Sequence, residues 1–538
     1  MLQTFEGGAG RAQLIAASGT GKTLLSLWVT ERMGAARAVY FAPSLALIRQ
    51  TALAWAAHGN PAVRVEAICV CSDETVVDDI PRADVPVPVT TDPAEVAAFL
   101  ARPLALDTRR VVFVTYQSVE RVEEAFAAAL GTYPEILPDL VLCDEAHRVA
   151  GPEGKRFQIV LDAGRIPGRH RLFLTATPRI VATEHAREDA YAFLASMDDV
   201  SLFGPVAYRL SFGEAIRLGL LADYVIAVLA VTDQEVRQLF SEPEEELVAL
   251  AQAVATTRAL ERGMFRHALS FHHTRKAAAR FADAVGRLAT EDRHRGWCVE
   301  TVFGDTPVSA RAATVDRVLA APRGLISNAK ALAEGVDLPA VDAVVFVDPR
   351  RSVVEIAQAV GRALRRDPRR PDKVAHIAIP LIVEEGADPE KVLAGSAWEP
   401  VWRVVAALAA HDDRLERDLA LAQRRLARAD AAVGGSAGVD EAAAALERSL
   451  LLSLPSRIPL PRFRRSVALQ ALKAAGDPFE YGFERLLAHA EETGSAAVPV
   501  AHVAPDGFAL GRWTASVRGA YRQGRLTEER IRRFETLP

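Results

Sequence analysis

The chain has 538 residues, half of them apolar, and a formal net charge of −5. This length exceeds what one hydrophobic core supports, so we expect several domains. The charge excludes a uniformly basic protein, so any nucleic-acid-binding surface must be local. We find no apolar run that would span a membrane and no signal peptide, which favours a cytoplasmic protein without membrane contact.

Short apolar runs alternate with helical patterns through the first 380 residues. The runs that fit strands are 12–17, 38–42, 111–115, 140–143 and 172–175, followed by 268–271, 299–303, 324–327, 343–347 and 375–379. Continuous apolar character is typical of parallel strands that are covered on both faces. We therefore predict an α/β fold with two doubly wound parallel-sheet domains, at residues 1–225 and 226–385.

The strand pattern stops after residue 385. Residues 399–432 read as one helix, with Pro400 in its first turn, where proline is tolerated. A glycine-rich turn, a second helix and a proline-containing linker follow. We predict a helical connector at residues 386–455 and a final amphipathic, α-helical unit at residues 470–538.

A glycine-rich segment follows the first predicted strand and precedes a helix. It consists of Ser18, Gly19, Thr20, Gly21, Lys22 and Thr23. The glycines would let backbone N–H groups surround phosphate oxygens, and the helix N-terminus adds positive potential. Lys22 would neutralise the β- and γ-phosphates, and Thr23 would hold Mg²⁺. Ala16 replaces the first glycine of the full phosphate-loop pattern, and a glycine-rich turn without a ligand is the alternative.

Two adjacent acids end the strand predicted at residues 140–143. Asp144 suits a direct or water-mediated contact with Mg²⁺, and Glu145 suits the general base that activates water against the γ-phosphate. The alternative is a solvated acidic turn, which Lys22 upstream disfavours. We assign His147 to coupling across a domain cleft, with a core or capping histidine as the alternative. The two segments together predict ATP and Mg²⁺ as ligands.

These segments resemble the motifs of superfamily 2 helicases of the DEAD/DEAH-box type. The resemblance covers residues 12–380, and the run from Asp144 to His147 matches motif II letter for letter. Thr175 and Thr177 belong to a Thr-Ala-Thr segment that matches motif III, which in the family links nucleotide state to nucleic-acid binding. The resemblance implies two RecA-like domains with ATP between them.

A motif in the second predicted domain implies catalysis across that cleft. Gln358, Arg362 and Arg365 match the family's motif VI. Charge that develops on a transferred phosphoryl group needs a cation, and an arginine of another domain supplies it only when the cleft closes. We therefore assign all three to catalysis, with a basic surface helix as the alternative. Gly335 and Asp337 lie in a segment that resembles motif V, which contacts nucleotide in the family.

Other family motifs imply contacts with nucleic acid. The residues concerned are Pro43, Ser44, Thr115 and Gln117 in the first domain, and Thr274 and Asn328 in the second. Ordinary loop and turn roles are the alternative for these residues. The Glu-Gly-Val-Asp-Leu-Pro form of motif V looks like that of bacterial members that act on DNA, so we expect DNA rather than RNA.

The C-terminal unit resembles the bacterial helicase-associated domain over residues 478–538. The resemblance rests on Leu-Gly-x-Trp, Tyr-x-x-Gly-x-Leu and terminal Leu-Pro elements. We expect nucleic-acid contacts from Arg512, Trp513, Arg522 and Arg525, because arginines pair with phosphates and aromatic rings stack on bases. In the alternative reading, the aromatic rings belong to the core and the arginines are only solvated.

The sequence as a whole predicts an ATP- and Mg²⁺-dependent helicase or translocase that acts on nucleic acid. Two alternatives stay open: the motor of a restriction or phage-defence assembly with a separate nuclease, and a catalytically weak nucleic-acid-binding protein. Family members carry an adenine-recognising glutamine upstream of the phosphate loop. Gln3 and Gln13 match that residue poorly, and this departure favours the weak-binding alternative.

Overall fold

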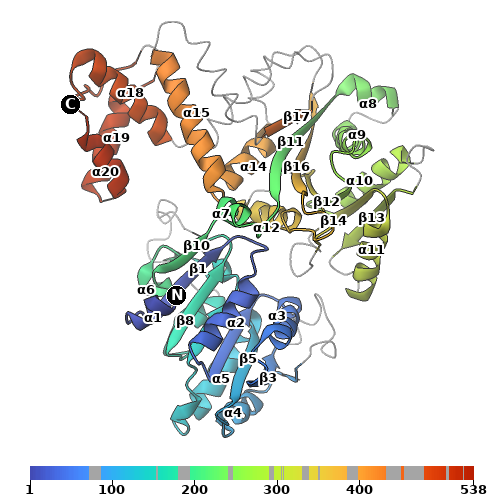
Figure 1. The fold of residues 1–538 in the computed structure, drawn as a ribbon, viewed down its shortest axis with the longest axis vertical. Helices are drawn as coiled ribbons and strands as arrows, with labels where there is room; N and C mark the ends of the chain where they lie inside the picture. Colours follow the sequence, from blue (N-terminus) through green and yellow to red (C-terminus); the bar gives the residue numbers. More distant parts are fainter. Residues whose placement is uncertain are drawn as a thin grey trace.

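The fold consists of two parallel-sheet domains and a helical C-terminal region, which Figure 1 shows beside the second sheet domain. The computed structural model describes residues 1–71, 87–152, 156–179, 194–239, 246–289, 296–303, 306, 308–329, 338–348, 352–383, 398–431, 450–453, 478–504, 508–524 and 526–537. The α/β class with two doubly wound sheets is confirmed. None of the helices in these ranges is both long and apolar enough to cross a membrane.

The first sheet has the strand order β10-β1-β8-β6-β2-β5-β3-β4, and its described pairs are parallel. Its strands are β1 (Arg11–Ala16), β2 (Arg37–Ala42), β3 (Arg64–Val70), β4 (Val89–Thr90), β5 (Thr108–Thr115), β6 (Leu140–Cys143), β8 (His170–Thr175) and β10 (Val206–Leu210). The five strands predicted for this domain are confirmed as β1, β2, β5, β6 and β8. The edge strand β10 was not predicted, because most of its residues are exposed or half-buried and give no continuous apolar run.

Helices lie on this sheet between its strands. They are α1 (Leu2–Glu6), α2 (Lys22–Arg32), α3 (Leu45–His58), α4 (Pro93–Ala101), α5 (Val119–Ala129), α6 (Val200–Phe203) and α7 (Phe212–Arg217). Short 3₁₀ turns occupy Tyr116–Ser118, Pro134–Ile136, Ala146–Arg148 and Arg156–Leu161, and β7 (Gly151–Pro152) pairs with β9 (Leu194–Ala195). Local sequence sets the helix starts: the Ser44 hydroxyl caps α3, and Asp92 caps α4 just before Pro93.

The second sheet has the order β13-β14-β12-β15-β16-β11-β17. Its strands are β11 (Asp223–Thr232), β12 (His267–Phe271), β13 (Cys298–Phe303), β14 (Gly324–Ala329), β15 (Ala343–Phe346), β16 (Val374–Val383) and β17 (Leu450–Ser453). The predicted boundary at residue 225 is wrong by a few residues, because it cuts β11. The helical connector predicted at 386–455 is also wrong in part, because Leu450 of β17 pairs with Ile226 of β11. A four-residue apolar run has no periodicity that separates strand from helix.

The remaining helices cover the second sheet and build the C-terminal region. They are α8 (Asp233–Leu239), α9 (Leu247–Glu261), α10 (Arg275–Leu288), α11 (Val308–Ala320), α12 (Val353–Ala363), α14 (Glu399–Ala409), α15 (Asp413–Ala431), α18 (Pro478–Thr493), α19 (Leu510–Arg522) and α20 (Glu528–Glu535). The single helix predicted at 399–432 is therefore two helices. The helical structure is interrupted before Asp413. The Asp412 carboxylate accepts a hydrogen bond from the backbone N–H of Arg414 at 2.9 Å and so caps α15.

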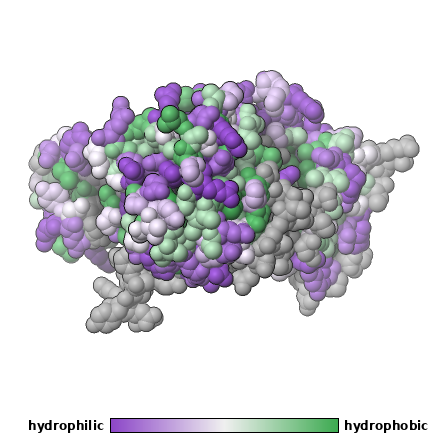
Figure 2. All heavy atoms as spheres, turned by 90° about the horizontal axis from the view of Figure 1, so that it is seen from below, coloured by the Kyte–Doolittle hydropathy of each residue, from purple (hydrophilic) through white to green (hydrophobic). Residues whose placement is uncertain are grey.

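The two sheet domains meet where β10 of the first leads through α7 to β11 of the second. The backbone N–H of Ala222 donates to the Leu364 carbonyl at 2.7 Å, and Leu221 pairs with Arg365 in an isolated antiparallel bridge. One buried apolar cluster runs through both domains. On the face seen in Figure 2, hydrophilic and hydrophobic residues are interspersed over the described surface. The joining segment thus holds the end of α12 close to the first domain.

Candidate nucleotide site between the two sheet domains

The turn between β1 and α2 has the backbone of a phosphate loop. Gly19 and Gly21 adopt φ values of +86° and +85°, in the left-handed region that strains residues with a Cβ atom. The Thr20 hydroxyl donates to the Ala17 carbonyl at 2.7 Å and steadies the turn. The Lys22 ammonium makes a long, 3.3 Å hydrogen bond to the Ala16 carbonyl, so it lies folded across the loop. This arrangement directs positive charge and backbone N–H groups toward one space.

The acid pair follows β6 at the same edge of the sheet. Asp144 is buried, and its Oδ2 accepts a hydrogen bond from the Tyr40 hydroxyl at 2.9 Å. The Tyr116 hydroxyl donates to the Asp144 carbonyl at 2.7 Å. Glu145 has a φ of +48°, and among the described residues no other non-glycine residue has a positive φ. Such strain is typical of functional sites.

Burial and neighbouring charges shift the pKa values of Asp144 and Glu145 in opposite directions. Burial, and then the charge of Glu145, raises the pKa of Asp144 to about 6. Burial also acts to raise the pKa of Glu145, but the Lys22 ammonium and contacts with His147 outweigh it and lower that pKa to about 2. The Lys22 ammonium and the contacts with His147 therefore favour the ionised form of Glu145, whereas burial favours the protonated form of Asp144.

His147 joins the acid pair to the end of the neighbouring strand β8. Its Nδ1 lies 3.3 Å from Oε2 of Glu145 and 3.2 Å from the hydroxyl of Thr175. The Thr175 hydroxyl also accepts a hydrogen bond from the backbone N–H of Thr177 at 3.1 Å. All three of these coupling candidates are buried. The structure thus places the residues predicted for coupling in one chain of contacts that starts at Glu145.

The second domain closes this space through α12. A cavity of about 450 Å³ is lined by Lys22, Thr23, Asp144 and Glu145 from the first domain and by Gln358, Arg362 and Arg365 from the second. The other predicted members of the wall are Ser18, Gly19 and Gly21. The helix and the loop touch directly: a Cβ atom placed on Gly361 would lie 2.4 Å from the Cβ of Ser18. Ten residues predicted from the two domains therefore line one cavity.

Other lining residues were not predicted from the sequence. Gln50 and His58 reach the cavity from α3, and Pro339 reaches it from the second domain. The first two carry no motif, and their position follows only from the packing of α3 beside α2. Pro339 is the last residue of the motif V segment, which could have identified it. Gly335 and Asp337 of that segment lie outside the described residues.

The residue types around the cavity fit a nucleoside triphosphate with Mg²⁺. Lys22, Arg362 and Arg365 supply three cations for phosphate oxygens, while Thr23 and Asp144 supply hard oxygen donors. Among the described residues, no group of three or more histidine, cysteine, aspartate or glutamate side chains could hold a metal ion by itself. This agrees with Mg²⁺, which commonly binds through one or two protein oxygens together with substrate phosphates and water.

The predicted nucleic-acid contacts of the first domain are mostly occupied with local structure. Thr115 is fully buried, and its hydroxyl is 3.1 Å from that of Ser118, which contradicts a contact with nucleic acid in this conformation. The Ser44 hydroxyl caps α3, and the Gln117 amide donates to the Pro43 carbonyl at 3.4 Å. Ser44 and Gln117 are only half-buried, so they stay candidates.

The two candidates of the second domain differ sharply in exposure. Asn328 at the end of β14 is 0% exposed, so the prediction that it contacts nucleic acid is wrong for this conformation. Asn328 was predicted to contact nucleic acid because it stands at the end of a strand. That position in the sequence does not show whether the side chain is buried. Thr274 is exposed and caps α10 by accepting a hydrogen bond from the backbone N–H of Ala277 at 3.1 Å. It stays a candidate.

The C-terminal helices use their aromatic residues for packing. The ring of Trp513 lies against Gly482 of α18 and between Phe479 and Phe534, with centroid separations of 6.0 and 6.3 Å. Packing therefore occupies part of the Trp513 ring, which is half-buried, and its contact with nucleic acid stays a prediction. Arg512 and Arg522 are exposed and stay candidates, while Arg525 lies outside the described residues.

The basic face of this region is also partly neutralised. Arg533 pairs with Glu480 at 2.7 Å, and Arg424 of α15 pairs with the same carboxylate at 2.6 Å. The Arg533 guanidinium is therefore occupied within the C-terminal region. These ion pairs fix α20 and α15 to α18.

Comparisons with known proteins agree with this arrangement. The family "Type III restriction enzyme, res subunit" matches residues 1–180, "Helicase conserved C-terminal domain" matches residues 251–367, and "Helicase associated domain" matches residues 477–537. These matches cover helicase domains of the superfamily 2 type, so the chain resembles the superfamily 2 helicases. Its C-terminal region is the helicase-associated domain that the sequence predicted.

Relatives and solved structures extend the likeness over most of the chain. A probable helicase of African swine fever virus is 26% identical over 383 residues, which are 70% of this chain and 39% of that protein. The type ISP restriction-modification enzyme LlaBIII, solved bound to DNA, superposes with a TM-score of 0.68 at 24% identity, over 91% of this chain and 33% of that one. The related enzyme LlaGI, in complex with a DNA substrate mimic, gives a TM-score of 0.57 at 23% identity, over 91% and 32%. The chain therefore spans well under two thirds of each of these proteins, and the structural likeness shows its fold.

Proposed function

We propose that the chain is an ATP-dependent motor that acts on nucleic acid, with ATP hydrolysed in the cavity between the two sheet domains. The observation that carries the proposal is the convergence of Lys22, Glu145 and Arg362 on one 450 Å³ cavity. Phosphate binding, a general base and a cation from the opposite domain are the groups that phosphoryl transfer to water requires. Lys22 begins α2, Glu145 follows β6 and Arg362 lies on α12. Because three separate elements supply these groups, local sequence does not explain why they meet at one cavity.

The residues act in distinct ways in this scheme. The phosphate loop and Lys22 bind the triphosphate, and Thr23 with Asp144 would hold Mg²⁺, which supplies positive charge between the β- and γ-phosphates when bound. Glu145 orients the attacking water and accepts its proton. Arg362, with Arg365 beside it, stabilises the charge that develops on the γ-phosphoryl oxygens. Gln358 lies on the same wall and positions the water or the nucleotide.

Contact between α12 and the phosphate loop makes hydrolysis depend on the domain arrangement. We expect Gly361→Ala to lower ATP turnover at least tenfold, because its Cβ would meet Ser18 at 2.4 Å and force the domains apart. A displacement of about 1 Å in a reacting group costs on the order of 100-fold in rate. Steady-state ATP hydrolysis and thermal unfolding of the variant provide the test.

A second helical glycine of the same domain, Gly286, provides the control. Gly286 of α10 has open space around its Cβ position, so Gly286→Ala should leave turnover unchanged. Both changes favour the helical state by about 0.5–1 kcal/mol, so neither should lower stability through helix propensity. Adding Ser18→Gly to Gly361→Ala should restore part of the activity. Equal turnover in the two single alanine variants would rule out the contact as a functional one.

The chain of contacts from Glu145 to Thr177 is the proposed path of coupling. We expect His147→Ala to keep basal ATP hydrolysis within about threefold while lowering its stimulation by nucleic acid at least tenfold; coupling energies of 1–3 kcal/mol correspond to such factors. His170→Ala is a suitable control, since this half-buried histidine begins β8, at the opposite end of that strand from Thr175. Turnover measured with and without polymer gives both quantities. A loss of basal activity without a change in stimulation would contradict the coupling role.

DNA is the proposed substrate in preference to RNA. The support is the motif V form, the helicase-associated domain at residues 477–537, and the DNA in the LlaBIII and LlaGI structures. The test is ATP turnover with duplex DNA, single-stranded DNA and RNA at equal nucleotide concentration. Stimulation by DNA is expected, and stimulation by RNA alone would overturn this preference.

Motor activity within a restriction or defence assembly is the second candidate function. The specific observation in its favour is the superposition on LlaBIII, an ATP-dependent restriction-modification enzyme, over 91% of this chain. Displacement of a third strand from a DNA triplex reports translocation, whereas displacement from a forked duplex reports unwinding. Triplex displacement without duplex unwinding would favour the restriction motor, with cleavage assigned to a separate nuclease.

A further inference from the structure

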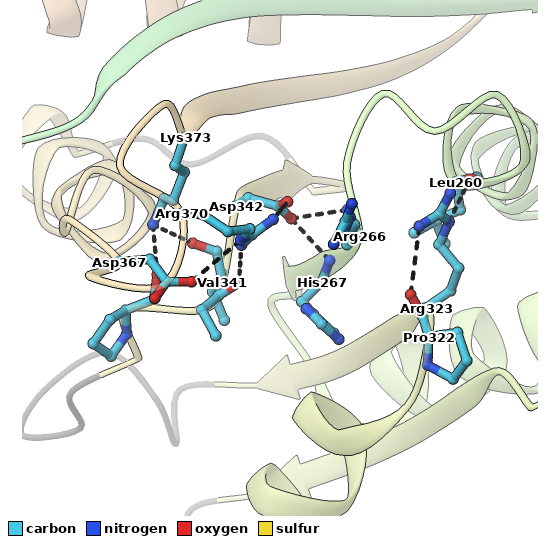
Figure 3. A network of polar contacts seen from close by, with 12 residues as sticks. Leu260, Arg266, His267, Pro322, Arg323, Val341, Asp342, Asp367, Arg370 and Lys373 are labelled. Atoms are coloured by element: carbon cyan, nitrogen blue, oxygen red, sulfur yellow. Dashed lines mark hydrogen bonds and ion pairs between the residues drawn. The ribbon is translucent and has the colours of Figure 1, made fainter.

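A buried lysine ties together two segments of the cavity wall from behind. Lys373 lies just before β16 and is 7% exposed. Its ammonium donates hydrogen bonds to three backbone carbonyls, those of Pro339 and Val341 at 2.7 Å and that of Arg365 at 2.6 Å. Figure 3 shows its side chain reaching toward Val341. Three carbonyl oxygens saturate the three donors of the ammonium group.

Two of the three carbonyls that Lys373 binds belong to residues that line the cavity. These residues are Pro339 and Arg365. The side-chain stem of Arg365 also lies against the phosphate loop, 3.4 Å from the position of a Cβ on Gly19. Lys373 is not among the cavity-lining residues. It therefore contacts the backbone of the wall and has no contact with the space that a nucleotide would fill.

Asp342, Arg370 and Asp367 form a network of ion pairs and hydrogen bonds beside Lys373. The Asp342 carboxylate accepts hydrogen bonds from the backbone N–H groups of Arg266 and His267 at 2.9 and 2.8 Å. It also pairs with the Arg370 guanidinium at 2.7 Å, and Arg370 bonds to Asp367 at 3.2 Å (Figure 3). Arg370 is thus bound between the Asp342 and Asp367 carboxylates.

Energetics favour a restraining role for this network. Breaking a buried, fully bonded charge by removing one partner is strongly destabilising, so the ammonium holds its three carbonyls in a fixed relation. Burial lowers the pKa of Lys373 to about 8, with the Asp342 carboxylate opposing that shift, so the amine carries its charge at pH 7. The segment 339–341 and the end of α12 are thereby joined through one side chain.

We propose that Lys373 is a positioning residue for catalysis, which fixes Arg365 and the segment 339–341 against the phosphate loop. This inference rests on the proposed function, because it assigns Arg365 to ATP hydrolysis. Lys373 would act on the chemical step through Arg365. Its loss should therefore lower kcat and leave ATP binding nearly unchanged, since the phosphate loop and Lys22 belong to the other domain.

The test compares Lys373→Met with Arg323→Met. Arg323 donates from Nε to the Leu260 carbonyl at 3.1 Å in the same domain, it lies apart from Lys373 (Figure 3), and it does not line the cavity. We expect Lys373→Met to lower kcat about 10- to 100-fold with KM for ATP within about twofold, and Arg323→Met to leave both unchanged. Amide hydrogen exchange at residues 339–342 and 364–366 should accelerate only in Lys373→Met.

Several outcomes would overturn the proposal. Wild-type kcat and exchange in Lys373→Met would do so, and so would an equal loss in Arg323→Met. If Lys373→Met unfolds, Lys373→Gln, which keeps a donor group, gives the same comparison. A cycle with Arg365→Ala adds a criterion: additive losses would show that Lys373 does not act through Arg365. If the wild-type chain hydrolyses no ATP, the proposed function fails, while the exchange experiment still decides whether Lys373 restrains the two segments.

Discussion

Replacing Glu145 with glutamine is expected to lower ATP turnover about 10²- to 10⁴-fold, the usual contribution of a general base. Glutamine keeps the size of the side chain and loses the carboxylate that would accept a proton from water. The carboxylate stands at the cavity with its pKa lowered to about 2, so it is ionised at neutral pH. ATP binding should persist in this variant, because Lys22 and the phosphate loop are unchanged.

Glu300→Gln is the matched control for that experiment. This glutamate lies on β13, a strand that contributes no residue to the cavity wall. Its carboxylate pairs with Arg317 at the surface at 3.0 Å. Its turnover should equal that of the wild type. Binding of a fluorescent ATP analogue, measured in parallel, separates loss of chemistry from loss of affinity. Turnover in Glu145→Gln within twofold of the wild type would remove Glu145 from the mechanism.

Arg362→Ala is expected to lower turnover about 10³-fold or more, which is the range reported for an arginine that stabilises a phosphoryl-transfer transition state. Arg362 is 7% exposed and faces the cavity from α12, so its charge acts in a site with little water. Its effect should fall on kcat rather than on KM for ATP, since the developing charge exists only in the transition state. Steady-state kinetics over a range of ATP concentrations measures both quantities.

Arg369 provides a control of the same residue type in the same part of the chain. It is exposed and outside the cavity wall, so Arg369→Ala should leave kcat and KM unchanged. Because Arg362 comes from the second domain, its effect also reports whether that domain takes part in catalysis. An Arg362→Ala variant with wild-type kcat would place catalysis in the first domain alone.

Much of the fold and of the nucleotide site followed from the sequence. Buried parallel strands give continuous apolar runs, and ten such runs correspond to strands of the two sheets. The nucleotide site was predictable because phosphate binding constrains the backbone itself. The glycines at 19 and 21 are needed for left-handed conformations, and the acids at 144 and 145 stand at a strand end. The cavity then brings together residues of motifs that lie more than two hundred positions apart.

Burial and pairing were the properties that the sequence did not reveal. Thr115 and Asn328 occupy strand ends like the catalytic acids, yet both are fully buried. Trp513 carries the same motif whether it packs or stacks, and part of its ring packs against Gly482. The role of Lys373 depends on three backbone carbonyls, and a carbonyl leaves no trace in the identity of its residue. These features depend on which distant segments meet.

The most direct measurement of the central claim is steady-state ATP turnover of the wild-type chain with duplex DNA, beside Glu145→Gln and Arg362→Ala under the same conditions. The account predicts turnover that DNA stimulates in the wild type and that nearly disappears in both variants, although each removes a group from a different domain. Turnover that is equal in all three proteins, or absent from the wild type with every polymer tested, would contradict it.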